Sequence, residues 1–147
     1  MAETLGMLCD KLTIIKLKQY HTTDEVRLSS LNNQAVQMQE EIDDYIKDAI
    51  NGVIPIEKLS FASNKVFKKE GNEVKEVSGK FGEIFYQLAD VNCRLWHEQE
   101  KVYEFEKVPA VEKDVVVKQL ALLNLERNHC IDAINKNLTD LISKKDN

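Results

Sequence analysis

The sequence contains few of the residues that end helices and form tight turns. Only five glycines and two prolines occur in 147 residues. Folds made of many short strands need turn residues more often than this, so the scarcity argues against them and favours long helices. Long apolar runs are also missing, and no stretch approaches the roughly 20 apolar residues that span a bilayer. The composition therefore predicts a helical protein and no membrane partner.

Cysteine is scarce and widely spaced. Cys9, Cys93 and Cys130 form no CxxC pair, which excludes the zinc-knuckle and thioredoxin-like motifs. Isolated cysteines of this kind are typical of reduced side chains packed on helices in a reducing compartment. The N-terminal residues also lack the basic start and apolar run of a signal peptide. We therefore expect a cytoplasmic location.

The chain has no long stretch of positive charge. Its 25 acidic residues outnumber the 20 basic ones, and the formal net charge is −5. General binding to DNA depends on neutralising many phosphates, which this charge balance does not favour. We expect no nucleic-acid partner, although a small basic pocket remains compatible with the composition.

Apolar residues at helical spacing are abundant. They predict four long helices, at residues 4–21, 24–50, 79–107 and 110–143. Thr23 is the expected N-cap of the second helix, and Gly52 suits the left-handed position after its end. The buried stripe of the first helix is expected to comprise Leu5, Leu8, Leu12, Ile15 and either Gln19 or Tyr20. Short connections imply antiparallel neighbours, so we predict an all-α antiparallel bundle forming one domain over residues 1–147.

Residues 53–79 are the least regular part of the chain. Pro55 is expected to open one helical turn. Residues 64–78 allow two interpretations, a small β-hairpin that turns near Gly71 or a charged loop, and the hairpin is preferred.

Polar side chains interrupt the apolar stripes of three predicted helices. The groups are Asp10, Lys11 and Lys18; Asn92, Trp96 and Glu100; and Asn124, Arg127, Asn128 and Asp132. A spacing of seven places Lys11 and Lys18 on one helix face, and spacings of three and four do the same for the members of the other two groups. Because buried polar groups must be paired, these groups predict either a structural network or a binding pocket between helices.

Both interpretations assign a role to Arg127. In the structural one, Arg127 pairs with Glu100 or Asp10 and the asparagines fix the register of the helices. In the functional one, basic side chains hold a small anionic, nucleotide-like ligand, because guanidinium groups suit phosphates and Trp96 can stack on a ring. The predicted ligand-binding residues are Lys11, Lys18, Asn92, Trp96, Glu100, Asn124, Arg127 and Asn128.

Three short motifs contain these polar residues. Residues 8–14 read LCDKLTI and are followed by Lys18, residues 88–100 read LADVNCRLWHEQE, and residues 124–131 read NLERNHCI. They are similar to the segments (L/V)xDKLSIxxxK, NxxLWHxED and NxxRNxxI of a group of uncharacterised bacterial and phage helical proteins, domain-of-unknown-function families 4254 and 6165. The chain departs from the pattern at Gln99-Glu100, where those proteins have an acidic pair, and at Tyr103, where they usually have arginine.

The resemblance covers both ends of the chain but not residues 22–80. It implies an all-helical fold with a shared polar cluster, and it implies no activity. It also suggests a phage-type sequestering protein, which would act in the host cytoplasm.

Enzymatic alternatives find weaker support in the sequence. Glu40, Glu41 and Asp44 resemble the EExxE half of a MazG-type nucleoside triphosphate pyrophosphohydrolase, which binds Mg²⁺ through carboxylates. The ExxD half fails, because Tyr86 stands three residues after Glu83. Only one ExxH pair suits a di-iron bundle, and the three histidines are too scattered to predict a zinc site. We expect no metal and no cofactor.

The leading hypothesis is a non-enzymatic, homo-oligomeric helical protein that binds a small anionic ligand. Self-association is inferred from the long helices and from Val115-Val116-Val117, which cannot all face one core. The alternatives are a protein-interaction module with a purely structural polar network and the MazG-like pyrophosphohydrolase.

Overall fold

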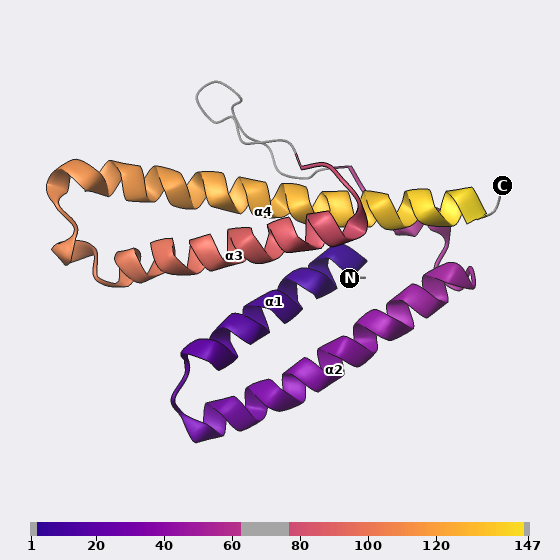
Figure 1. Ribbon diagram of the computed structural model, residues 1–147, viewed down its shortest axis with the longest axis horizontal. Helices are drawn as coiled ribbons and strands as arrows, with labels where there is room; N and C mark the ends of the chain where they lie inside the picture. The colour runs from indigo at the N-terminus through magenta and orange to yellow at the C-terminus, as the bar shows by residue number, and fades with distance from the viewer. Residues whose placement is uncertain (1–2, 63–76, 146–147) are drawn as a thin grey trace.

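The structure, a computed structural model, describes residues 3–62 and 77–145 and is an all-α fold (Figure 1). Its elements are α1 (Leu5–His21), α2 (Glu25–Ile50), the 3₁₀ helix η1 (Ile56–Lys58), α3 (Phe81–Tyr103), the 3₁₀ helix η2 (Phe105–Lys107) and α4 (Ala110–Lys145). None of the described residues forms a strand, and α1–α2 and α3–α4 are two helical hairpins. The predicted all-α bundle of four long helices is confirmed, whereas the β-hairpin expected at residues 64–78 lies almost entirely outside the described residues.

The first hairpin begins each of its helices with a polar cap. Thr4 Oγ1 accepts a hydrogen bond from the Met7 amide at 3.4 Å. Asp24 Oδ1 accepts from the amides of Val26 at 2.9 Å and Arg27 at 3.2 Å. The predicted N-cap of α2 was therefore wrong by one residue. The Asp24 carboxylate accepts hydrogen bonds from two amides, and its negative charge complements the positive end of the helix dipole. Asp24 is therefore a better cap than the neighbouring Thr23.

The third helix ends earlier than predicted. Its α-helical part stops at Tyr103 rather than at residue 107, because Glu104 leaves the helical region with φ −119° and ψ 41°. A 3₁₀ turn follows, and Val108 then adopts an extended conformation with ψ 128°. The proline at position 109 disfavours a helical residue before it, which explains why the chain reverses here. The start of α4 at Ala110 agrees with the prediction.

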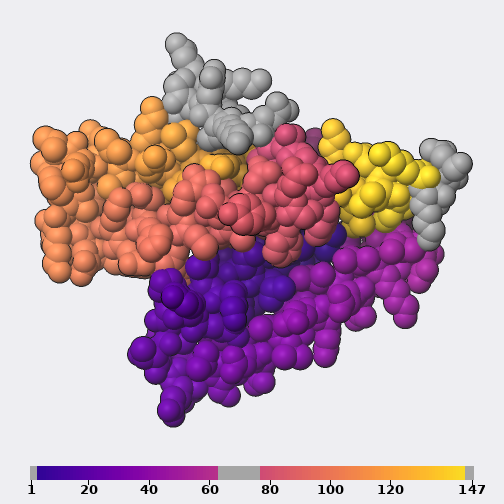
Figure 2. Space-filling view, viewed as in Figure 1, coloured from indigo at the N-terminus to yellow at the C-terminus, as the bar shows by residue number. Residues whose placement is uncertain are grey.

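The core lies where α1 crosses the α3–α4 hairpin. Its buried apolar residues are Leu5, Cys9, Ala49, Leu59, Ile84, Leu88, Val91, Cys130, Ile134, Leu138 and Ile142. Only the C-terminal half of α2 reaches this core, and α2 otherwise packs mainly against α1. The space-filling view accordingly shows α1 between α2 and α3 (Figure 2).

Two sequence predictions about individual apolar residues have different outcomes. Tyr20, one of two candidates for the end of the α1 stripe, is 83% exposed. Gln19 is half-buried instead, and its amide donates a hydrogen bond to Asn32 Oδ1 at 2.9 Å. Val116 is buried while Val115 and Val117 are exposed, as the argument from their spacing required.

Gly6 marks the closest approach of α1 to α4. Its amide donates a hydrogen bond to Asn135 Oδ1 at 2.7 Å, and both residues are buried. A Cβ at this position would overlap the Ile131 carbonyl oxygen and lie 2.9 Å from Asn135 Oδ1. The gap between α1 and α4 at this position therefore has no room for a side chain, and only glycine fits.

None of the helices in residues 3–62 and 77–145 combines the length and the apolar character that crossing a bilayer needs.

Candidate functional site

A buried carboxylate, Asp10, lies at the centre of the polar cluster. Its side chain is only 5% exposed. Arg127 Nε donates to Asp10 Oδ1 at 2.8 Å, and Arg127 Nη2 donates to Asp10 Oδ2. Asn92 Nδ2 donates to Asp10 Oδ1 at 3.0 Å. The carboxylate on α1 is thereby bound from both α3 and α4.

Thr13 completes this network, which we call the Asp10 clamp (Asp10, Thr13, Asn92 and Arg127). Asn92 Nδ2 also donates to Thr13 Oγ1 at 2.7 Å, and the Thr13 hydroxyl donates to the Asp10 carbonyl at 2.7 Å. Hydrogen bonding to Asp10 and its negative charge raise the pKa of Arg127 against the opposing effect of burial. The clamp is a charge-compensated connection between three helices, in which Arg127 pairs with Asp10 rather than with Glu100.

The predicted ligand-binding residues do not converge on one cavity. Asn92 and Arg127 belong to the Asp10 clamp. Lys11 is exposed and forms an ion pair with Glu3 near the start of the chain. Lys18 and Trp96 line a separate pocket near the α1–α2 turn.

The remaining predicted residues are not among those that line this pocket. Glu100 is exposed, and its Oε1 lies 3.9 Å from Nδ1 of His97. Asn128 Nδ2 donates to the Asn124 carbonyl at 2.7 Å, one turn earlier on α4. The structure thus divides the predicted cluster into a buried clamp and a more exposed group, and a ligand for either remains a prediction.

A groove that the sequence did not predict lies between α1, α2 and α3. It has a volume of about 1090 Å³. Its α1 surface includes Leu12, Lys16 and Leu17, and its α2 wall includes Ala35 and Val36. Phe85, Ala89, Cys93 and His97 form the α3 wall.

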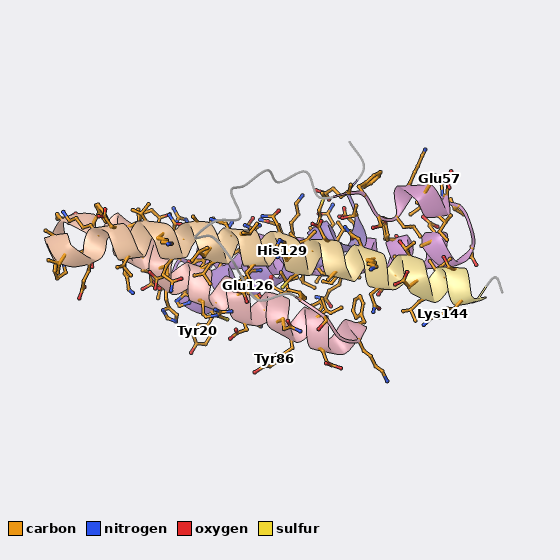
Figure 3. All side chains as sticks on the ribbon, turned by 90° about the horizontal axis from the view of Figure 1, so that it is seen from above. Tyr20, Glu57, Tyr86, Glu126, His129 and Lys144 are labelled. Carbon is orange, nitrogen blue, oxygen red and sulfur yellow. The ribbon has the colours of Figure 1, made fainter. Side chains whose placement is uncertain are left out.

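The α3 wall is a second stripe beside the buried one. Positions 85, 89, 93 and 97 are four residues apart, so they form a line of roughly 18 Å along the helix. Tyr86 next to this line is 75% exposed, and Figure 3 shows Tyr20 and Tyr86 projecting on the same side of the molecule, away from α4. The repeated spacing was the available sequence signal for the groove.

A second, more polar hollow adjoins the groove, and we call it the corner pocket. It has a volume of about 640 Å³ and includes Lys18, His21, Asp24, Arg27 and Trp96 in its lining. The hydroxyl residues Thr22, Thr23 and Ser30 also line it. His21 lines both hollows, so they are neighbours. Its ring stacks on Trp96, with the centroids 4.7 Å apart and the planes 11° from parallel.

The three cysteines have different environments, and none forms a disulfide. Burial raises the pKa of Cys9 to about 11 and that of Cys130 to about 11, with smaller effects from nearby charges. Both thiols therefore stay protonated at neutral pH and are shielded from reagents. Cys93 is exposed in the groove wall, which makes it a chemical probe of that surface.

The residues considered for metal chemistry are dispersed. Among the described residues, no group of three or more His, Cys, Asp or Glu side chains could hold a metal ion. Glu40, Glu41 and Asp44 are exposed on α2. Glu126, half of the single ExxH pair, forms an ion pair with Arg94 at 3.0 Å.

Fold and site together define an all-α helical protein with a buried Asp–Arg clamp beside an apolar groove. Comparison with protein-family models, with curated proteins and with solved structures found no match. The resemblance of the three motifs to bacterial and phage helical proteins therefore stays a prediction.

Proposed function

We propose that the chain is a protein-interaction module that binds an amphipathic α-helix of another protein in the groove. The observation that carries the proposal is the groove itself, which is about 1090 Å³ in volume and has a largely apolar lining contributed by three helices. Only the C-terminal half of α2 joins the core, which leaves the groove beside its N-terminal half. A guest helix in this position would complete a four-helix arrangement with α1, α2 and α3.

The dimensions of the groove suit a helix. Its α3 wall of roughly 18 Å corresponds to about three helical turns of a guest. Recognition of this kind uses apolar anchors at positions i, i+3 or i+4, and i+7 of the bound helix. Val36 is 57% exposed, and Phe85 and Ala89 are half-buried, so apolar surface is available for such anchors. Contiguous exposed apolar surface with a polar rim is typical of an interaction site.

The Asp10 clamp supports the proposal indirectly. It connects α1, which forms the floor of the groove, to α3, which forms one wall. A groove whose helices are fixed in advance loses little conformational entropy when the guest binds. The clamp also uses both hydrogens of the Asn92 amide and two guanidinium nitrogens of Arg127 internally. This arrangement favours a structural role for these two residues.

A carboxylate placed on the apolar α2 wall of the groove should weaken helix binding strongly without affecting the fold. Val36→Glu introduces a carboxylate at an exposed groove position, and Val26→Glu is the matched control on the same helix, 80% exposed and outside the groove. We would sort a yeast-displayed library of 15-residue amphipathic helical peptides for binding to the fluorescently labelled chain. Selected peptides are expected to bind Val36→Glu at least about tenfold more weakly than the wild type and Val26→Glu normally.

Two further readouts locate the bound peptide and identify other occupants. Alkylation of Cys93 should be slower in the presence of a selected peptide, because Cys93 lines the groove. The proposal is wrong if no selected peptide distinguishes wild type from Val36→Glu. It is also wrong if sedimentation shows a dimer that Val36→Glu dissociates, because the occupant would then be a second copy of the chain.

The corner pocket favours a second candidate function, the binding of a small anionic, nucleotide-like ligand. Lys18, Arg27 and Trp96 line this pocket together with hydroxyl side chains, which can donate hydrogen bonds to the oxygens of a phosphate. Two of these residues, Lys18 and Trp96, belong to the ligand site predicted from the sequence.

A thermal-shift screen against nucleotides, dinucleotides and sugar phosphates tests this second function. A ligand should raise Tm in a saturable manner, since binding to the folded state adds RT ln(1 + [L]/Kd) to its stability. The shift should disappear in Lys18→Ala and persist in Lys11→Ala, which removes an exposed lysine of the same helix outside the pocket. If no compound raises Tm, or if both variants keep the shift, this candidate is rejected.

A further inference from the structure

Resting on the proposed helix-binding function, we infer that the guest helix carries acidic residues in its C-terminal half and binds with that end over the corner pocket. The inference assigns both a charge pattern and a direction to the partner. Its basis is the uneven distribution of charge along the groove.

The groove is free of acidic side chains although the chain is acidic. The sequence has 25 Asp and Glu residues, yet none is among the described residues that line the groove. The nitrogen-bearing side chains of basic residue types in the lining are Lys16 in the middle of the groove and His21 and His97 at one end. Burying an acidic guest side chain against this surface therefore meets no opposing carboxylate in the lining.

The two ends of the groove differ in charge. At the end formed by the α1–α2 turn, the corner pocket adds Lys18 and Arg27. Its one carboxylate, Asp24, accepts hydrogen bonds from the amides of Val26 and Arg27 as the cap of α2, and its Oδ2 lies 4.0 Å from Nε of Arg27, so Lys18 is the cation of this pocket that Asp24 does not pair with. At the opposite end Gln39 is the last α2 residue of the lining, and acidic residues follow it on α2: Glu40, Glu41, Asp43 and Asp44.

This difference in charge between the two ends of the groove favours one direction for a bound helix. The C-terminus of a helix carries a partial negative charge and unpaired carbonyl groups, and its N-terminus carries a partial positive charge. Lysine and arginine side chains near a helix C-terminus stabilise it and can donate to its last carbonyls. The favourable arrangement places the C-terminal end of the guest near Lys18 and Arg27, and its N-terminal end near the acidic stretch of α2.

The peptide library described above also tests the charge pattern. Selected sequences should be enriched in Asp and Glu in their C-terminal halves. For the tightest peptide, changing those acids to lysine should weaken binding by at least about tenfold. Lys18→Glu should remove most of this preference, because Lys18 lines the corner pocket over which the acidic half of the guest is expected to bind. The matched variant Lys118→Glu, an exposed change on α4 outside the groove, should keep it.

The direction can be read from Trp96, the single tryptophan of the chain, which borders the corner pocket. A nitroxide attached to the C-terminus of the selected peptide should quench Trp96 fluorescence more strongly than the same nitroxide at its N-terminus. Stronger quenching from the N-terminal label would overturn the direction, and selection of uncharged or basic peptides would overturn the charge pattern. Either result leaves helix binding itself intact, whereas a library without groove-dependent binders rejects the proposed function.

Discussion

Arg127→Ala is expected to lower the free energy of unfolding by about 3 kcal/mol. The change removes two of the three side-chain donors of Asp10, whose own side chain is 5% exposed. The buried carboxylate then keeps only the Asn92 amide as a side-chain donor. Removing one partner of a buried pair costs about 3–5 kcal/mol, and the lower end applies because Arg127 is 31% exposed. Urea unfolding followed by circular dichroism measures the loss.

Two further variants separate the clamp from general effects of losing an arginine. Arg94→Ala removes an arginine that is 48% exposed and pairs with Asp90 and Glu126 at 3.0 Å, so it should cost less than about 1 kcal/mol. Asp10→Asn combined with Arg127→Ala should lose less than the sum of the single changes, because no unpaired charge remains. Equal losses for Arg127→Ala and Arg94→Ala would contradict a structural role for the clamp.

Gly6→Ala is expected to destabilise the fold by about 3 kcal/mol, the upper part of the usual range for overpacking a core. The new methyl group would overlap the Ile131 carbonyl oxygen and lie 2.9 Å from both Ile131 Cγ2 and Asn135 Oδ1. One of these atoms belongs to the backbone of α4, which cannot rotate out of the way as a side chain can, so α1 must move away from α4. That movement would lengthen the 2.7 Å hydrogen bond from the Gly6 amide to Asn135. Thermal unfolding should show a clearly lower Tm.

The matched control is Gly82→Ala in α3. No atom lies within 4 Å of a Cβ at Gly82 outside its own helix backbone and neighbours. Alanine restricts the unfolded chain and favours the helix, so this variant should be more stable by about 0.5–1 kcal/mol. If Gly6→Ala unfolds at the wild-type temperature, the close crossing of α1 and α4 is not as described.

Local patterns in the sequence predict the helices well, and their ends less well. Leu5, Leu8 and Ile15 of the predicted stripe are buried as expected, because helical spacing determines a common face. Leu12, the other member expected between them, is only half-buried because it lines the groove. The α2 cap and the end of α3 depend on competition between adjacent residues. Asp24 caps in place of Thr23, and the proline at position 109 acts on the turn that precedes it. The residue at which a helix begins or ends depends on small energy differences between neighbouring residues, and the spacing of apolar residues does not report these differences.

The candidate site was predictable only in part. Asp10, Asn92 and Arg127 interrupt apolar stripes, so their burial and one of the two pairings proposed for Arg127 followed from the pattern. Lys11 and Lys18 share a face with each other, but spacing within one helix does not reveal that Lys11 pairs with Glu3. The groove required knowing that α2 and α3 lie on either side of α1, which is a property of tertiary packing.

The Asp10 clamp also has a consequence for the order of folding. Within each hairpin the helices are close in sequence, whereas the clamp joins α1 to α4 across 117 positions. Closing so large a loop is entropically costlier than closing a hairpin, and contacts distant in sequence tend to form late. The α3–α4 hairpin can therefore assemble first and receive α1 afterwards. Loss of clamp contacts would then act mainly by accelerating unfolding, so the clamp would determine the lifetime of the native state more than the rate at which it forms.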